Sequence, residues 1–342
     1  MARVTLNTIA EAVGVSRTTV SNAFSRPDQL NPELRRRILE VAEEMGYAGP
    51  DPAARTLRRG KAGVIGVLLT EELSYAFTDP YAVAFLRGLS EVAETSSTSL
   101  LLMAWPDEAA AERAVREAIV DGFVAFCVDE DHPVLDVLRQ RRLPFVIAGE
   151  PYLEGVPFVG IDDRTAARTL CTHLLKLGHR RLGVLSASHP RLGGALGTTG
   201  AIAWRLAGYR DAVLEAGLSW DDVVAEILTP HSREGGRSGT AQLLDLHPRP
   251  TAIIATTDLI ALGALQAVAE RGLTVPANVS VAGFDDIPEA GEAGLTTIRQ
   301  PKSEKGRTVA RLLLEEGIGD APHILMPHEL ITRSSTAPPP AI

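Results

Sequence analysis

From residue 62 onward, short apolar runs alternate with stretches of helical periodicity, and this alternation limits the fold more than any other feature. The runs that read as strands are 64–69, 99–103, 123–128, 145–148, 158–161, 182–186, 223–228, 253–256 and 279–284. Helices are expected between them over 81–94, 109–120, 164–177, 205–216, 235–246 and 259–271. Strands that are apolar almost throughout are typical of parallel sheets covered on both faces. The pattern therefore predicts an α/β core of two Rossmann-like parallel-sheet subdomains.

The first fifty residues follow a different pattern, that of short helices joined by tight turns. Apolar residues recur every three to four positions from Leu6 to Val13, Thr5 suits the N-cap, and Gly14 can take the left-handed turn that ends a helix. Ser16 can cap a second helix. The polar residues near the start of that helix, which we expect to point outward, are Arg17, Thr18, Ser21 and Asn22. A third helix begins after Asn31, so residues 1–49 are predicted to form an all-α helix-turn-helix head.

Residues 50–61 are expected to link the head to the core. The segment Gly49-Pro50-Asp51-Pro52 breaks the chain, and residues 53–59 suit one short helix. Even about 12–15 residues are marginal for an isolated helix in water. We therefore expect this helix to order only against DNA and a symmetry partner. The alternative is a plain linker without a folded state of its own.

Charge is distributed unevenly along the chain, whose net value is −9. Residues 1–61 hold ten Lys and Arg against seven Asp and Glu, so the amino-terminal segment is basic and the remainder acidic. Only this segment is expected to meet phosphate. No apolar run approaches the roughly 20 residues of a membrane span, and no apolar signal segment precedes the head. Cys127 and Cys171 suit free thiols in a reducing compartment, so a cytoplasmic location without membrane contact is expected.

The chain resembles the LacI/GalR family of transcriptional regulators from Val4 to about Arg333. The most specific segments are VTLNTIAEAVGVSRTTVSNAF at 4–24 and the hinge-like PDPAARTLRRGK at 50–61. Supporting segments are VIGVLL (64–69), DGFVAF (121–126), VGIDD (159–163), HLLKLGHRRLGVL (173–185), RLAGYRDA (205–212), TDLIALGAL (257–265), NVSVAGFDD (278–286) and LTTIRQP (295–301). It is the order of many segments, rather than any one of them, that makes the resemblance specific.

This resemblance implies a homodimer whose paired heads read a near-palindromic operator in double-stranded DNA. It also implies a periplasmic-binding-protein-like core over residues 62–336, in which the chain crosses three times between subdomains. The N-subdomain would comprise 62–164 and 298–326, and the C-subdomain 165–297 and 327–336. The segment from Ser334, with its run of prolines, reads as a loose tail, of which 337–342 lie beyond the core. No heptad-bearing helix follows Arg333, which favours a dimer over a tetramer.

The DNA-binding residues implied by the resemblance are Thr5, Ser16, Arg17, Thr18, Ser21, Asn22, Arg55 and Leu57. Arg17, Thr18 and Asn22 match base-reading positions of the family. At such positions Arg can donate two hydrogen bonds to guanine O6 and N7, and Thr can contact a thymine methyl group. The alternative for Arg17 is a phosphate contact alone. Leu57 matches a hinge leucine that wedges into the minor groove, and Arg55 a hinge arginine beside it. The alternative for Leu57 is a buried contact with the core.

The effector-binding residues expected in the cleft between the subdomains are Tyr75, Phe77, Tyr81, Arg205, His231, Asp258 and Asp285. Arg205 offers a forked donor, and the two carboxylates accept from hydroxyls, which suits a neutral polyol such as a sugar and disfavours an anion. The alternative is an Arg–Asp network that braces the strand ends. The aromatic residues could stack on a sugar ring or pack in the core. Thr257 stands where many sugar-binding relatives have Asn, so sugar identity does not carry over.

Two other classes of protein fit the sequence less well. A periplasmic solute-binding protein would explain the core but not residues 1–61. An NAD- or phosphate-using enzyme would need a glycine fingerprint, and GGALGTTG at 193–200 lacks both the GxGxxG spacing and a following Lys. Histidines and cysteines show no metal-ligand spacing, and His179 suits a helix-end partner rather than a catalyst. The chain is thus expected to be a ligand-controlled repressor without enzymatic activity, cofactor or metal.

Overall fold

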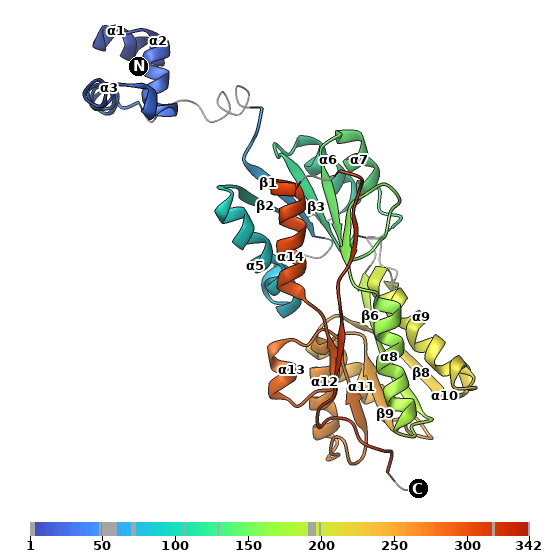
Figure 1. Cartoon of the computed structure of the whole chain (residues 1–342). Helices are drawn as coiled ribbons and strands as arrows, with labels where there is room; N and C mark the ends of the chain where they lie inside the picture. Colours follow the sequence, from blue (N-terminus) through green and yellow to red (C-terminus); the bar gives the residue numbers. More distant parts are fainter. Residues whose placement is uncertain are drawn as a thin grey trace. The chain divides into compact units, whose positions relative to one another are not determined.

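The computed structural model describes residues 4–47, 49, 60–69, 73–104, 107–128, 130–190, 196–197, 200–316 and 319–340. The chain divides into two compact units, Met1–Ala62 and Gly63–Ile342 (Figure 1). The expected hinge residues Arg55 and Leu57 lie outside the described residues.

The amino-terminal unit is built from α1 (Leu6–Val13), α2 (Arg17–Ser25), the short 3₁₀ helix η1 (Pro27–Gln29) and α3 (Pro32–Glu44). The expected caps are confirmed: the Thr5 hydroxyl accepts from Thr8 N, the Ser16 hydroxyl accepts from Thr19 N, and Gly14 has φ 77°. The helices pack around a small apolar core of Ile9, Ala10, Val13, Val20, Ala23, Ile38 and Ala42. This unit therefore has an apolar core of its own, separate from those of the second unit.

The N-subdomain of the second unit is a parallel sheet in the order β12-β5-β4-β3-β1-β2. Its strands are β1 (Val64–Leu69), β2 (Ser99–Met103), β3 (Gly122–Phe126), β4 (Phe145–Ala148), β5 (Phe158–Gly160) and β12 (His323–Leu325). One face carries η2 (Tyr75–Phe77), α5 (Pro80–Thr95), α14 (Lys302–Arg311) and η3 (Leu312–Glu316), and the other carries α6 (Glu108–Glu117) and α7 (Val134–Arg141). Both faces are thus covered, as the apolar strands require.

The C-subdomain has a parallel sheet in the order β10-β9-β6-β8. Its strands are β6 (Leu182–Pro190), β8 (Val224–Pro230), β9 (Ala252–Ala255) and β10 (Ser280–Ala282), with β7 (Leu196–Gly197) antiparallel to the end of β6. Helices α8 (Asp163–Lys176) and α9 (Gly200–Glu215) cover one face, and α11 (Arg233–Leu244) and α12 (Asp258–Glu270) cover the other. Two short helices, α10 (Trp220–Val223) and α13 (Pro288–Glu292), complete it.

Three segments carry the chain between the subdomains, as the family resemblance implies (Figure 1). The first follows β5 and leads into α8. The second and third contain β11 (Thr297–Arg299) and β13 (Glu329–Ile331), which pair antiparallel with Thr297 opposite Ile331. The order of elements and the two parallel sheets confirm the predicted fold class.

Glycines let the covering helices approach each other closely. A Cβ atom added to Gly88 in α5 would lie 1.9 Å from the backbone oxygen of Ser303 in α14. One added to Gly208 in α9 would lie 2.1 Å from the backbone oxygen of Arg164 in α8. At both positions only hydrogen fits, so each helix pair is packed backbone against backbone.

Two expectations, one about the carboxy-terminal segment and one about the start of a helix, need correction. The tail expected to be loose from Ser334 is bound to the C-subdomain, where Ser335 Oγ donates to Val281 O at 2.6 Å and Ala337 O accepts from His179 Nε2 at 2.8 Å. The helix expected over 205–216 begins earlier, at Gly200. Among the described residues, none of the helices has the length and apolar character that crossing a membrane requires.

Candidate functional site

The exposed start of α2 carries most of the residues expected to read DNA. Arg17 and Thr18 are exposed and Asn22 is partly exposed. Ser21 does not point outward as expected: it is only 9% exposed, and it is buried with Val20 and Ala23 of the same helix. The hydroxyls of Thr5 and Ser16 are engaged in capping α1 and α2.

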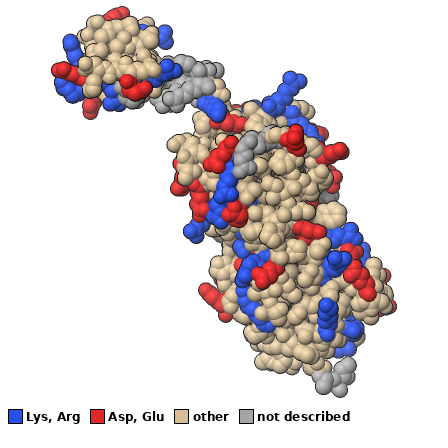
Figure 2. Space-filling view, viewed as in Figure 1, with Lys and Arg blue, Asp and Glu red and all other residues tan. Residues whose placement is uncertain are grey.

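Lys and Arg side chains lie on the face of this unit that Figure 2 shows, and their contacts differ from one residue to the next. Arg35 Nε donates to Ala23 O at 3.1 Å, and Arg36 pairs with Glu40 at 2.7 Å. By contrast, within the described part of the unit, the exposed guanidinium groups of Arg17 and Arg26 have no hydrogen-bond or ion-pair partner. Unpaired guanidinium groups on a helix-turn-helix can bind phosphate or base edges without breaking an internal contact.

In the second unit, Arg205 is the centre of a buried polar cluster at the junction of the two subdomains. Its side chain, 6% exposed, extends from α9. Nε donates to Asp163 Oδ1 at 2.8 Å, and Nη1 donates to Thr256 O at 2.7 Å. The guanidinium lies 3.7 Å from the centroid of the Phe284 ring, which covers one of its faces.

Asp285 joins the cluster from the loop after β10. Its Oδ1 lies 3.7 Å from Arg205 Nη1 and accepts from Gln300 Nε2 at 2.6 Å. Burial raises the pKa of Asp285 to about 7, since the Arg205 charge only partly offsets desolvation and Asp258 adds to the rise. The carboxyl can therefore both accept and give up a proton near neutral pH.

Asp258 is placed differently from the other two predicted polar residues. It is fully buried, and both of its oxygens are used within the C-subdomain: Oδ1 accepts from Thr297 Oγ1 at 2.6 Å, and Oδ2 accepts from Ile287 N at 3.0 Å. Burial raises the pKa of Asp258 to about 6. In this geometry Asp258 braces the loop that carries Asp285 through Thr297 and the backbone of Ile287, and not through the arginine of the alternative Arg–Asp network given above.

The structure adds residues to the cluster that sequence reasoning missed, namely Asp163, Gln300 and Lys305. Lys305, 2% exposed, donates from Nζ to Tyr81 OH at 2.8 Å and to Gln300 Oε1 at 3.2 Å. Tyr81 is positioned by Asp79, whose carboxylate caps α5 by accepting from Tyr81 N and Ala82 N. Asp163, the first residue of α8, and Gln300 lie in the quoted VGIDD and LTTIRQP segments, but neither was singled out from the sequence.

The remaining predicted effector residues are less closely tied to this cluster. Phe77 is 64% exposed, and the side chain of Tyr75 lies outside the described residues. His231 follows directly after β8 and is partly exposed. Of the glycine-rich segment 193–200, residues 193–195 and 198–199 lie outside the described ranges.

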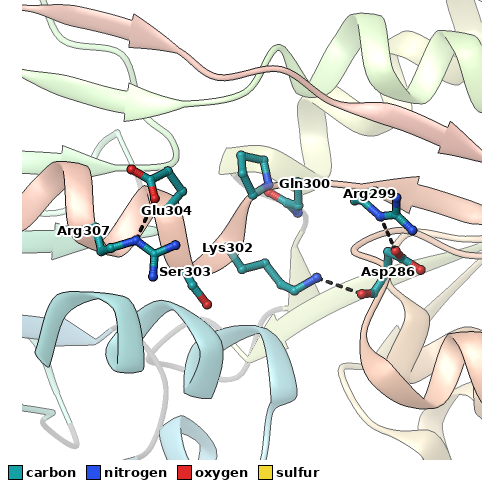
Figure 3. A pocket seen from close by; sticks show the side chains of 8 residues that line it. Asp286, Arg299, Gln300, Lys302, Ser303, Glu304 and Arg307 are labelled. Atoms are coloured by element: carbon teal, nitrogen blue, oxygen red, sulfur yellow. Dashed lines mark hydrogen bonds and ion pairs between the residues drawn. The ribbon is translucent and has the colours of Figure 1, made fainter. Parts of the chain in front are cut away.

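A pocket of about 340 Å³ lies beside the cluster, where the segment after β11 enters α14 (Figure 3). Its lining residues are Asp286, Arg299, Gln300, Pro301, Lys302, Ser303, Glu304 and Arg307. Lys302 Nζ donates to the backbone oxygens of Asp285 at 2.5 Å and Asp286 at 2.8 Å, and Arg299 Nε donates to Asp286 Oδ2 at 2.6 Å. These contacts hold Asp285 at φ 120° and Asp286 at φ 54°, a left-handed backbone that is costly for residues other than glycine.

No group of three or more metal-ligating side chains occurs among the residues that the structure describes. The cluster is instead a continuous set of hydrogen-bond donors and acceptors. It runs from Tyr81 and Lys305 in the N-subdomain through Gln300 to Asp285 and Arg205 in the C-subdomain. Such an arrangement suits the recognition of a small molecule with several hydroxyl groups.

Comparison with known proteins is consistent with this geometry. Residues 5–49 match the model described as bacterial regulatory proteins, lacI family, and residues 171–336 match a periplasmic binding protein-like domain. An HTH-type transcriptional regulator of Mycobacterium tuberculosis is 40% identical, over 99% of this chain and 98% of its own length.

Two solved structures show the same architecture over nearly the whole chain. The transcriptional regulator CelR, solved in complex with cellobiose, matches with a TM-score of 0.71 and 26% identity over 98% of this chain and all of its own. The lac repressor dimer bound to operator and an anti-inducer matches with a TM-score of 0.80 and 23% identity over the same shares.

Proposed function

This chain belongs to the lacI family of bacterial regulatory proteins, and from that premise we propose that a sugar bound at the junction of its core subdomains controls its binding to operator DNA. As a member, it is a transcriptional regulator with a helix-turn-helix DNA-binding domain and an effector-binding domain. The finer statements below, on contact residues, effector, oligomer and sign of control, extend that family assignment. The single observation that carries the proposal is the buried cluster of hydrogen-bond donors and acceptors around Arg205, Asp163 and Asp285.

For DNA, we propose that Arg17, Thr18 and Asn22 contact base edges, and that Leu57 wedges into the minor groove beside Arg55. The exposure of Arg17 and the lack of a partner for its guanidinium, among the described residues, support the first part. Arg17→Ala is expected to weaken operator binding and change base preference, as measured by selection from a random DNA pool. Arg36→Ala, which removes a guanidinium already paired with Glu40, is the matched control. An equal loss of affinity for all DNA sequences in the pool would show that Arg17 contacts phosphate alone.

The Leu57 wedge has an independent test in DNA shape. A wedge unstacks a base step and bends the duplex, so Leu57→Ala should lower both operator affinity and bend angle. Circular-permutation gel shifts measure the bend directly. A variant with both quantities unchanged would contradict the wedge.

We propose that the functional unit is a homodimer that represses transcription, with two heads on the two halves of a near-palindromic operator. The lac repressor neighbour is a dimer bound to operator, which supports this arrangement. Sedimentation of the full chain with and without operator should give a dimer in both cases. A monomer that binds single half-sites with full affinity would contradict it.

For the effector, we propose an uncharged sugar that contacts Arg205, Asp163 and Asp285. The cellobiose bound by CelR supports the ligand class. The Oδ2 atoms of Asp163 and Asp285 have no donor among the described residues, so each can accept from a sugar hydroxyl. Asp258, tied up within the C-subdomain, would act by positioning. Tyr75, Phe77 and His231 remain candidate contacts at the edge of the site.

The test is a calorimetric screen of the full chain against neutral mono- and disaccharides, including cellobiose and D-ribose, followed by operator titrations with each sugar that binds. Linkage requires the sugar to change DNA affinity by the factor by which DNA changes sugar affinity. Arg205→Met should abolish measurable sugar binding. A sugar that binds without altering operator affinity would defeat the control mechanism, and retention of full affinity by Arg205→Met would remove Arg205 from the site.

A further inference from the structure

Lys305 is a buried cation whose neighbours do not explain its charge. Its side chain is 2% exposed on the inner side of α14, where neighbouring inward positions hold the apolar residues Val309 and Ala310. The two partners of its Nζ, Tyr81 OH and Gln300 Oε1, are neutral. Within the described residues, no carboxylate oxygen lies within 4.0 Å of Nζ.

A residue of this kind is expensive to keep for stability alone. Removing an ammonium from water is strongly unfavourable, and only a close ion pair with good geometry offsets that cost. Burial lowers the pKa of Lys305, while the more distant charges of Asp163 and Asp285 raise it. A methionine or leucine would fill the same space in α14 without the desolvation cost. The ammonium therefore calls for a role other than packing.

The position of Lys305 in the polar cluster indicates that role. Lys305 lies at the N-subdomain end of a series that is linked by hydrogen bonds through Gln300 to Asp285, which in turn forms an ion pair with Arg205 at 3.7 Å. An ammonium has three N–H donors, and two are used. The third has no acceptor among the described residues, and Lys305 Nζ also lies 5.5 Å from the centroid of the Tyr81 ring.

Charge balance across the cluster defines the ligand further. The two cations, Lys305 and Arg205, share the cluster with at least as many carboxyl groups, those of Asp163 and Asp285, and the buried Asp258 and Asp79 act on Asp285 as well. An acidic ligand would add negative charge for which the cluster holds no spare cation, whereas an uncharged ligand adds none. The donor-only character of Lys305 and the acceptor-only character of ionised carboxylates also give the ligand a direction.

We infer that Lys305 is a ligand-contacting, specificity-determining residue, which donates its third N–H to an acceptor oxygen of an uncharged polyol whose hydroxyl hydrogens go to Asp163 and Asp285. This rests on the proposed function, in which a sugar occupies the junction of the subdomains. The polyol thus presents an acceptor oxygen to the N-subdomain and donor hydroxyls to the C-subdomain, so it bridges both.

The experiment compares the full-length wild type with Lys305→Met and with Lys176→Met, the same substitution at an exposed position of α8. Probes are cellobiose, D-glucose, D-galactose and D-ribose, with D-glucuronate and D-galacturonate as acidic counterparts. For any neutral sugar that binds, Lys305→Met should lower affinity by about 10- to 100-fold, the range for a hydrogen bond to a charged group. Lys176→Met should leave the affinity unchanged. Equal affinity of Lys305→Met and wild type would overturn the inference, and so would an acid that binds wild type more tightly than its neutral parent.

Deoxy derivatives of a sugar that binds locate the contact. On wild type, one deoxy derivative should bind more weakly than its parent sugar. On Lys305→Met, that derivative and its parent should bind equally well, because the missing oxygen and the missing ammonium are partners. If every derivative loses the same factor in both proteins, the contact does not exist.

Thermal unfolding without any sugar separates this inference from the proposed function. A lysine kept for ligand recognition predicts that Lys305→Met melts at the same temperature as Lys176→Met or higher. If Lys305→Met melts more than about 4 °C below Lys176→Met, Lys305 is retained for stability, and the inference is overturned. If wild type binds none of the neutral sugars, the sugar effector is contradicted, and the melting comparison still decides whether Lys305 is retained for stability.

Discussion

Replacing Arg205 by methionine tests whether the cluster is as tightly interdependent as its geometry indicates. The guanidinium donates to Asp163 at 2.8 Å and to Thr256 O at 2.7 Å, and it lies 3.7 Å from Asp285. Methionine keeps the length and apolar contact with Phe284 but leaves two buried carboxylates without a counter-ion. Breaking a buried pair from one side costs about 3–5 kcal/mol, and we expect Arg205→Met to lose that much unfolding free energy near pH 8.

The loss should shrink as pH falls, because Arg205 holds down the pKa of Asp285. That pKa is already about 7 with the arginine present, and it rises further without it. A carboxyl whose pKa is raised in the folded state binds a proton more readily there than in the unfolded chain. Lowering the pH to about 5.5 therefore favours the folded variant and should recover a large part of the deficit.

Urea unfolding followed by tryptophan fluorescence gives the measurement, since all three tryptophans lie after residue 62 and report only the second unit. Arg168→Met is the matched control from the same subdomain. Its partner Glu215 is 59% exposed, so losing that surface pair should cost less than about 1 kcal/mol. A loss for Arg205→Met no larger than that of the control, or one independent of pH, would refute the reasoning.

Three further outcomes are expected. In the wild type, the unfolding free energy should rise as pH falls from about 8 to about 5.5, since the raised pKa of Asp285 lets the folded state bind the extra proton, and Asp285→Asn should flatten that slope in the same urea titrations. Gly88→Ala should lose about 2 kcal/mol or more by overpacking α5 against α14, whereas Gly319→Ala, with open space around it, should lose little; comparable melting temperatures would contradict the close approach. Ser335→Ala should lose about 1–3 kcal/mol by leaving buried backbone groups unpaired, while the exposed Ser334→Ala should not; equal stability of the two would show the tail to be loose after all.

Much of the fold could be predicted because it depends on runs of apolar residues. The bounds expected for the strands at 64–69, 99–103 and 145–148 agree with β1, β2 and β4. Helix α14 was missed because its sequence, KSEKGRTVAR, has a lysine and a glycine at buried positions where periodicity requires apolar residues. The need for glycine at position 306 follows only from the packing of α14 against α5, where a Cβ atom would lie 2.2 Å from the backbone oxygen of Phe85. The three-residue strands β11, β12 and β13 are too short to show any period.

The site could be predicted in part, for a related reason. Arg205 and Asp285 lie at the ends of recognisable segments, and the structure brings them together. Gln300 and Lys305 belong to the cluster only because the chain crosses back to the N-subdomain after β11, which no local pattern announces. Likewise, Ser21 is a polar residue next to Asn22 in the sequence, and its burial depends on how α2 packs within the head.

The glycine-mediated helix contacts bear on how such regulators could be recombined. The close contact at Gly88 joins two helices of the N-subdomain, α5 and α14, and the one at Gly208 joins two helices of the C-subdomain, α9 and α8. Within the described part of the core, three segments join these halves, so a chimaera that exchanges one entire half with a relative keeps both helix contacts intact. A chimaera that takes the two helices of such a pair from different proteins would instead place backbones together that do not fit at this close distance. The natural cut points for building hybrid sensors are therefore the segments around β11, β13 and the start of α8.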